Sequence, residues 1–204
     1  MGSHPPGMII SRMVGWLMLA VVFRLEPLVV AEDVRAPMRK AGELIRKQEP
    51  AKVVKEVEEM VTPDNASIVI SLGEQRLRML GDGQLYIDSP VSTGKRAGMT
   101  PAGEFKVLEK DPNHRSNRYG AFVDEKGRTV RDGVSLRVDA APSGTRFRGA
   151  PMKWFLRLTQ DGVGLHVGVL PGYPASHGCV RLPAEIAELI YQRVKVGTVV
   201  TIEP

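Results

Sequence analysis

The sequence predicts a mostly-β domain, a sandwich or partly open barrel with one late helix, preceded by an N-terminal signal and a helical spacer. From Ser67 onward, several short segments place apolar residues at every second position, as half-buried strands do. Clusters of Gly, Pro, Asn and Asp separate these segments. A single apolar stripe with helical spacing stands near the C-terminus. Together these patterns favour strands over helices for most of the chain.

The N-terminal region follows the pattern of a secretory signal. Arg12 precedes the apolar run Met13–Phe23, and Val29 and Ala31 suit the −3 and −1 positions of a cleavage site. We therefore expect residues 1–31 to direct export to the periplasm or cell envelope. An uncleaved segment would attach the chain to a membrane, although a spanning helix needs about 20 apolar residues. A buried core helix is the remaining interpretation of this run.

A charged stretch, residues 32–65, comes next. Apolar residues recur in it at i, i+4, i+7 and i+8, which predicts an amphipathic helix; they are Val53, Val57, Met60 and Val61. Pro50 suits the beginning of this helix and Pro63 its end. We interpret the stretch as a spacer or docking helix without chemistry of its own.

The domain that follows, residues 66–204, reads as a series of strands. The segments with strand character are SIVISL (67–72), RLRML (76–80), QLYIDSPVSTG (84–94), GEFKVLEK (103–110), GVSLRV (133–138), FLRLT (155–159), VGLHVGV (163–169) and TVVTIE (198–203). The GDG stretch at 81–83 predicts a hairpin between two of them. The late helix begins at Pro183, a residue tolerated in a first turn. Its apolar stripe consists of Ile186, Leu189, Ile190 and Val194.

Composition is that of a soluble globular protein, with 43% hydrophobic and 25% charged residues. The net charge of +5 favours an acidic partner such as an anionic lipid or a cell-wall polymer. The basic residues are scattered and form no nucleic-acid-binding motif, so we expect no nucleic acid as a partner. A single cysteine excludes an internal disulfide.

That cysteine and one histidine are the candidate catalytic residues. Gly164, His166 and Gly168 alternate along one strand face, so His166 stands on a face without neighbouring side chains, where a ligand backbone could approach. Cys179 lies in SHGCVR, which is too polar for a core. A nearby histidine would promote its thiolate, so we expect thiol reactivity below the free-cysteine pKa of about 8.5. Gly178 leaves room for a carbonyl whose oxygen could bind local N–H groups.

The stretch LHVGVLPGYPASHGCVRLP, residues 165–183, resembles the active-site signature of the L,D-transpeptidase catalytic domain family. These are cysteine enzymes that cross-link bacterial peptidoglycan. VSTG (91–94) and TPAGEF (100–105) resemble two further family segments. The resemblance covers Ser67 to Glu203 and implies an L,D-transpeptidase-like fold for residues 66–204. The spacing from His166 to Ser176 is shorter than in many members.

The resemblance also implies roles for individual residues. Cys179 would be the nucleophile and His166 the general base and later acid. The oxyanion site and its support would come from Ser176, His177, Gly178 and Arg181, together with the Cys179 amide. Arg181 would brace the loop or bind a substrate carboxylate. NHRSNRYG (113–120) resembles a substrate-side loop, which implies substrate contacts for His114, Arg115 and Tyr119. Trp154 would line the same cleft or serve as a core aromatic.

The implied reaction has two steps. The Cys179 thiolate attacks the third residue of a peptidoglycan tetrapeptide stem and expels the terminal D-alanine. An amine of a neighbouring stem then takes the acyl group from the thioester, which forms a 3–3 cross-link. Water as acceptor would make the enzyme an L,D-carboxypeptidase, and a protein amine would make it an anchor of envelope proteins. No metal or organic cofactor is required, and carbapenems acylate the cysteine of this family.

Two interpretations of other classes remain open at this point. His166, His177 and Cys179 could be three zinc ligands. The domain could also be a non-catalytic wall-binding module with a decayed site. The intact set of histidines, cysteine and arginine favours an enzyme.

Overall fold

The computed structural model describes residues 1–2 and 46–204. The chain divides into two compact units, Met1–Met38 and Arg39–Pro204, and the account below concerns the second. The signal predicted around Met13–Phe23 falls outside the described residues. In the part of the chain that the structure describes, every helix is too short or too polar to span a bilayer.

A six-stranded sheet forms one layer of the fold, with the strand order β1-β4-β3-β2-β13-β5. Its strands are β1 (Lys52–Val53), β2 (Ala66–Ser71), β3 (Arg76–Gly81), β4 (Gln84–Pro90), β5 (Gly103–Lys106) and β13 (Val199–Glu203). The predicted hairpin joins β3 to β4. Asp82 and Gly83 both adopt positive φ, 48° and 79°, as the tight turn of a twisted hairpin requires.

A second sheet of four strands carries the chemistry described below, in the order β12-β11-β10-β6. Its strands are β6 (Glu109–Asp111), β10 (Phe155–Arg157), β11 (Gly164–Val167) and β12 (Val180–Leu182). β12 runs parallel to β11, whereas β10 is antiparallel to both its neighbours. This sheet follows from the predicted segments at 103–110, 155–159 and 163–169.

One hydrophobic core joins the two sheets and the helix. Ile68, Ile70, Leu77 and Met79 contribute to it from the first sheet. Leu156, Leu165, Val180 and Leu182 contribute from the second. Each such fully buried aliphatic side chain stabilises the fold by about 1.5–3 kcal/mol. The core therefore fixes the second sheet against the first.

The late helix is where the sequence predicts it. Helix α1 spans Ala184–Arg193, and Pro183 is its N-cap residue. Ile186 and Ile190 are buried in the core, and Val194 is buried just after the helix ends. The mostly-β fold with one late helix is confirmed, and the sheets do not close into a barrel.

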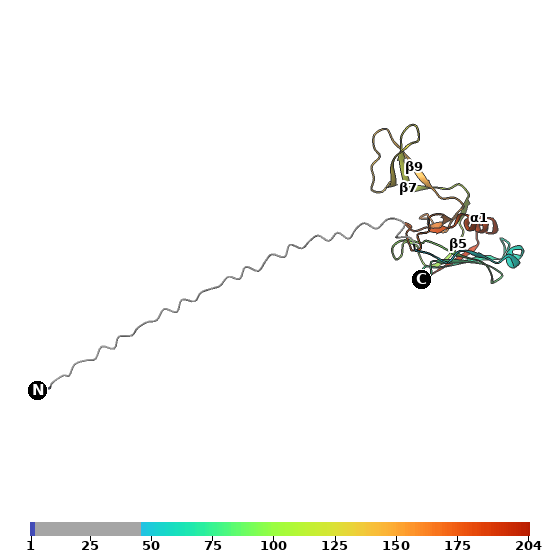
Figure 1. The fold of residues 1–204 in the computed structure, drawn as a ribbon, viewed down its shortest axis with the longest axis horizontal. Helices are drawn as coiled ribbons and strands as arrows, with labels where there is room; N and C mark the ends of the chain where they lie inside the picture. Colours follow the sequence, from blue (N-terminus) through green and yellow to red (C-terminus); the bar gives the residue numbers. More distant parts are fainter. Residues whose placement is uncertain (3–45) are drawn as a thin grey trace. The chain divides into compact units, whose positions relative to one another are not determined.

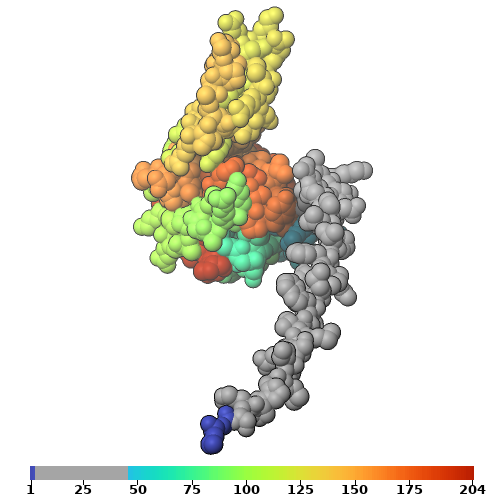
Figure 2. All heavy atoms as spheres, turned by 90° about the vertical axis from the view of Figure 1, so that its left-hand side faces the viewer, coloured from blue at the N-terminus to red at the C-terminus, as the bar shows by residue number. Residues whose placement is uncertain are grey.

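A third sheet of three strands, here called the arm (residues 115–151), stands out from the other two (Figures 1 and 2). Its strands are β7 (Arg115–Val123), β8 (Thr129–Ser135) and β9 (Arg146–Pro151), in the order β8-β7-β9. The sequence predicted a loop at 113–120, but most of it belongs to β7. The strand signal is weak because the arm is solvated on much of its surface; even Val130 and Val138 are 53% and 83% exposed.

The stretch before the first sheet also differs from expectation. In place of a long amphipathic helix, the chain forms β1 and then a short 3-10 helix, η2 (Lys55–Met60). The β-branched Val53 pairs with Ile87 of β4, which suits a strand better than a helix. Val57 and Val61 still pack on the core, as the apolar spacing suggested. The end of the predicted spacer is thus built into the fold.

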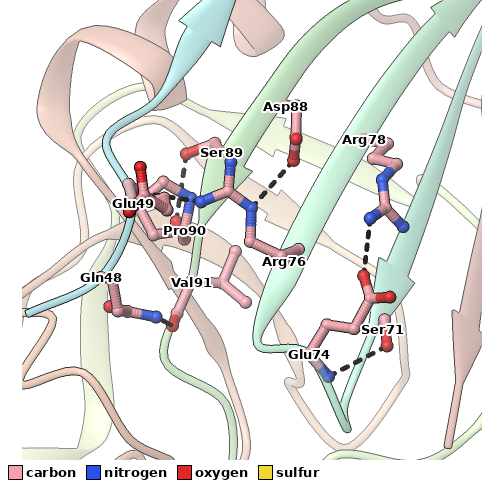
Figure 3. A network of polar contacts seen from close by, with 10 residues as sticks. All are labelled: Gln48, Glu49, Ser71, Glu74, Arg76, Arg78, Asp88, Ser89, Pro90 and Val91. Atoms are coloured by element: carbon pink, nitrogen blue, oxygen red, sulfur yellow. Dashed lines mark hydrogen bonds and ion pairs between the residues drawn. The ribbon is translucent and has the colours of Figure 1, made fainter.

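Polar contacts fasten Gln48 and Glu49 to the ends of β3 and β4 (Figure 3). Arg76 Nε donates to Asp88 Oδ1 across the two strands at 2.9 Å, and its Nη1 donates to the Glu49 carbonyl at 2.8 Å. Gln48 Nε2 donates to the Val91 carbonyl at 3.2 Å. These bonds hold the chain where it leaves β4 and turns toward the second sheet.

Candidate active site

A row of side chains crosses the four-stranded sheet on one face. Asp111 of β6 pairs with Phe155 of β10, and His166 of β11 pairs with Arg181 of β12. Leu156 pairs with Leu165, so Phe155 stands opposite His166 in the same antiparallel register. Directly opposed residues point to the same face of a sheet. The fold thereby gathers an acid, an aromatic ring, an imidazole and a guanidinium side by side.

The two glycines beside His166 make room for this row. A Cβ at Gly164 would lie 2.6 Å from Cε2 of Phe155, and one at Gly168 would lie 2.7 Å from Cγ of Arg181. The sequence suggested that the glycines leave the face empty for a ligand. Instead, the Phe155 ring and the Arg181 stem occupy these spaces. The glycines are required because side chains of the neighbouring strands cross over β11.

Cys179 lies just before β12, at the end of a loop that several hydrogen bonds fix. Ser176 Oγ donates to the Cys179 carbonyl at 2.6 Å and accepts from the Gly178 amide at 3.0 Å. Thr100 Oγ1 donates to the Gly178 carbonyl at 2.7 Å. Gly178 has a φ of 137°, and a Cβ there would lie 2.9 Å from the Met99 carbonyl oxygen. Only glycine fits this position.

Thr100 is a supporting residue that the sequence did not single out. It belongs to TPAGEF, which the family resemblance had identified without a role. Its Oγ1 also accepts from the Gly94 amide at 2.8 Å, and Gly94 forms a β-bridge with Ser176. The motif therefore connects the two loops beneath the cysteine.

The thiol and the imidazole point from neighbouring strands into one space. Cys179 precedes Arg181 by two residues, so both side chains share the His166 face. In this resting arrangement Sγ donates to the Gly162 carbonyl at 3.5 Å. His166 Nδ1 donates to its neighbour's carbonyl, that of Val167, at 2.7 Å. That bond fixes the tautomer and leaves the Nε2 lone pair available as a base.

Burial determines the charge state of this pair. It lowers the pKa of His166 to about 4, against a smaller raising effect of the bond to Val167. Burial also raises the pKa of the Cys179 thiol, although the Gly164 amide and the charge of Arg181 oppose this. The pair therefore rests as thiol and neutral imidazole at neutral pH. Reactivity below the free-cysteine pKa, as the sequence predicts, therefore depends on His166 taking the thiol proton during the attack rather than on a resting thiolate.

His177 makes its contacts away from that pair. Its ring stacks on Tyr119 of the arm, with centroids 4.3 Å apart and planes at 18°. Lys95 Nζ donates to its Nε2 at 3.2 Å. Burial lowers the pKa of His177, as do the charges of Lys95 and Arg181. The residue therefore joins the arm to the cysteine loop as a neutral ring.

These groups line a cavity of about 650 Å³. Its lining includes the predicted site residues Cys179, His166, Ser176, His177, Gly178, Arg181, His114 and Tyr119. The guanidinium of Arg181 has no ion-pair partner within residues 46–204. The cavity thus presents an unpaired cation beside the thiol, which suits an anionic group on a substrate.

Two predicted substrate residues lie elsewhere. Arg115 is exposed on β7 and donates to the Gly149 carbonyl at 2.7 Å. The Trp154 ring packs on the Tyr191 ring, with centroids 5.1 Å apart, and lies against the core. Of the two roles weighed for Trp154, the core aromatic describes its position.

The described residues contain no group of three or more His, Cys, Asp or Glu side chains arranged to hold a metal ion. His166, His177 and Cys179, weighed above as zinc ligands, are therefore not gathered around a common point. His166 hydrogen-bonds to the Val167 carbonyl, His177 contacts Lys95 and Tyr119, and Cys179 Sγ donates to the Gly162 carbonyl.

Comparison with known proteins identifies the family of the catalytic domain. The family model of the L,D-transpeptidase catalytic domain (YkuD) matches residues 65–202. No match is found among curated proteins. Among solved structures, an L,D-transpeptidase from Mycobacterium smegmatis is similar, with a TM-score of 0.51 and 22% identity over 69% of this chain and 59% of that one.

A second similar structure is LD transpeptidase LdtMt1 in complex with imipenem. It has a TM-score of 0.50 and 20% identity, over 68% of this chain and 58% of that one. The chain thus spans about six tenths of the length of the solved structures it matches. At these identities the likeness concerns the fold.

Proposed function

Since the chain belongs to the L,D-transpeptidase catalytic domain family, we propose that it is an L,D-transpeptidase that acts on peptidoglycan tetrapeptide stems through a thioester on Cys179. The observation that carries the proposal is the position of His166 and Cys179. They share one face of the paired strands β11 and β12 and open into one cavity. An imidazole with its Nδ1 occupied and a thiol within the same cavity are the parts of a general-base-assisted nucleophile.

In the first step Nε2 of His166 takes the thiol proton as sulfur bonds to the carbonyl carbon of the third stem residue. The C–N bond to the terminal D-alanine breaks, and the same imidazole returns the proton to the leaving amine. We assign the Cys179 amide as a donor to the oxyanion, because the Gly178 amide already donates to Ser176 Oγ. Arg181 supplies the cation for a stem carboxylate.

In the second step an acceptor attacks the thioester. A stem amine would give a 3–3 cross-link, the reaction we propose as part of cell-wall biogenesis. Water would give L,D-carboxypeptidase activity, and a protein amine would attach an envelope protein. All three use the same acyl-enzyme, and neither step requires a metal or organic cofactor. The similarity to an imipenem complex supports the further proposal that carbapenems acylate Cys179.

We expect the purified protein, incubated with disaccharide tetrapeptides, to release D-alanine and form cross-linked dimers. Mass spectrometry identifies the donor and acceptor in each product. Tripeptides without dimers would identify a carboxypeptidase. Intact tetrapeptides, with no acyl-enzyme on the protein, would contradict the proposed function.

We also propose that residues 1–31 export the enzyme to the envelope, where peptidoglycan stems are found. The support is the sequence pattern around Met13–Phe23. A fusion of residues 1–40 to alkaline phosphatase, which is active only outside the cytoplasm, is expected to be active in bacterial cells. A fusion in which Leu17→Arg and Val21→Arg interrupt the apolar run should be inactive. Equal activity of the two fusions would contradict export by this segment.

A further inference from the structure

We propose that His114, held by Asp111, is a second general base in the cavity and serves the incoming acceptor amine. This inference rests on the proposed function, because it concerns the second step of that reaction. It assigns a chemical role to a residue for which the sequence suggested only substrate contact.

His114 is fixed in place more firmly than a surface residue needs to be. Its Nδ1 donates to Asp111 Oδ2 at 3.1 Å, and its ring stacks on the Phe155 ring with centroids 4.2 Å apart and planes at 13°. The His114 carbonyl accepts from the Met152 amide at 2.9 Å. Its side chain is 21% exposed and lines the cavity. A restrained imidazole thus faces the space into which the thiol opens.

Asp111 holds two groups at once. Oδ1 accepts from the Asn113 amide at 3.0 Å, which shapes the turn between β6 and β7. Oδ2 accepts from the His114 ring. With the proton on Nδ1, the Nε2 lone pair is left for a base, and the carboxylate maintains that tautomer. His166 has the same arrangement, with the Val167 carbonyl in place of the carboxylate.

The sheet register places Asp111 in the same row as His166. Asp111, Phe155 and His166 stand on three successive strands in one row, and adjacent strands are about 4.8 Å apart. The Phe155 ring, from β10, lies over Gly164 of β11. Cys179 directly precedes β12, which pairs with the other edge of β11. His114 stacks on that ring, and its side chain lines the same cavity as Cys179 and His166.

The acceptor step needs a base within reach of the incoming amine, and His114 lines the cavity from the turn between β6 and β7. A primary amine has a pKa of about 10, so its ammonium form first releases one proton to water. The neutral amine that then attacks must release a second proton as the amide forms. In the step we propose, the amine nitrogen bonds to the thioester carbonyl as its proton passes to Nε2 of His114. The C–S bond then breaks, and the Cys179 thiolate leaves. His114 releases its proton to water, and the Cys179 thiolate takes a proton from water to return to the resting thiol.

The test separates the two half-reactions. Acylation of Cys179 by imipenem needs no acceptor amine, and intact-protein mass spectrometry measures it. The acyl-enzyme formed from a tetrapeptide reacts either with an amine acceptor, which gives a dimer, or with water, which gives a tripeptide. We expect His114→Gln to lower dimer formation about 100-fold, while imipenem acylation stays within about twofold of the wild type. His114→Phe, which keeps an aromatic ring to stack on Phe155, should show the same loss.

Asp111 is a positioning residue, and its variant tests the tautomer. Asp111→Asn keeps an oxygen for the Asn113 amide but turns an NH₂ donor toward Nδ1, which moves the ring proton to Nε2. We expect dimer formation to fall about tenfold or more, again without loss of acylation. Asp124→Asn, at a surface carboxylate that pairs with Arg128 on the arm, is the matched control and should behave as the wild type.

Each outcome decides the matter. Selective loss of dimer formation in the His114 and Asp111 variants supports the inference. Equal loss of both half-reactions, or loss of neither, overturns it and leaves His114 a structural residue. If the wild type forms no acyl-enzyme on any stem peptide, the proposed function fails and this inference fails with it.

Discussion

Cys179→Ser is expected to abolish acylation by tetrapeptides and by imipenem, with a loss on the order of 10⁴-fold or more. A serine hydroxyl is much harder to deprotonate than a thiol, and a base whose pKa is about 4 cannot compensate. Protein incubated with imipenem should gain the inhibitor's mass only if it carries the cysteine. Intact-protein mass spectrometry measures this directly.

The same variant should still fold. Sγ makes one weak contact, to the Gly162 carbonyl, and the loop is held by Ser176 and Thr100 rather than by the thiol. The free energy of unfolding is therefore expected to change by less than about 1 kcal/mol. An adduct on Cys179→Ser, or retained cross-linking, would refute the cysteine mechanism.

His166→Ala is expected to lower acylation at pH 7 by about 10²–10⁴-fold and to change its pH dependence. In the wild type the base is lost only as pH falls through the His166 pKa of about 4, because protonated imidazole cannot accept the thiol proton. The acylation rate should therefore be nearly flat from about pH 5 to neutrality. Without the imidazole, only thiolate reacts, so the rate should rise about tenfold per pH unit toward the raised thiol pKa.

Imipenem acylation rates between pH 4 and 9 measure both profiles. If wild type and His166→Ala share one pH dependence, His166 is not the base. His177→Ala then becomes the informative variant, since His177 is the next imidazole in the cysteine loop. Its contacts with Lys95 and Tyr119 favour a supporting role instead.

The sequence predicts the parts of the fold in which one face of an element is buried. Ile68, Ile70, Leu77 and Met79 alternate along β2 and β3 and are fully buried. The apolar stripe of α1 is predicted for the same reason, since Ile186 and Ile190 are buried. The arm cannot be predicted in this way, because β8 is exposed along most of its length and therefore has no apolar residues at every second position. β12 is too short, at three residues, to show a period at all.

For the site, the motif around Cys179 and the strand around His166 identify the two central residues. The residues that position these two side chains cannot be identified from the sequence, because their contacts join segments far apart in the chain. Thr100 and Gly178 are 78 positions apart, and the Phe155 ring over Gly164 depends on strand register. The charge state of the thiol is a property of burial, so it appears only with the tertiary structure.

The position of β13 has a consequence for folding. This last strand lies between β2 and β5, and Val200 pairs with Ile68 on one side and Phe105 on the other. The six-stranded sheet therefore stays divided until Val199–Glu203 are in place. Such long-range pairing makes folding slow. We therefore expect the six-stranded sheet to assemble only after β2, β5 and β13 have all been synthesised.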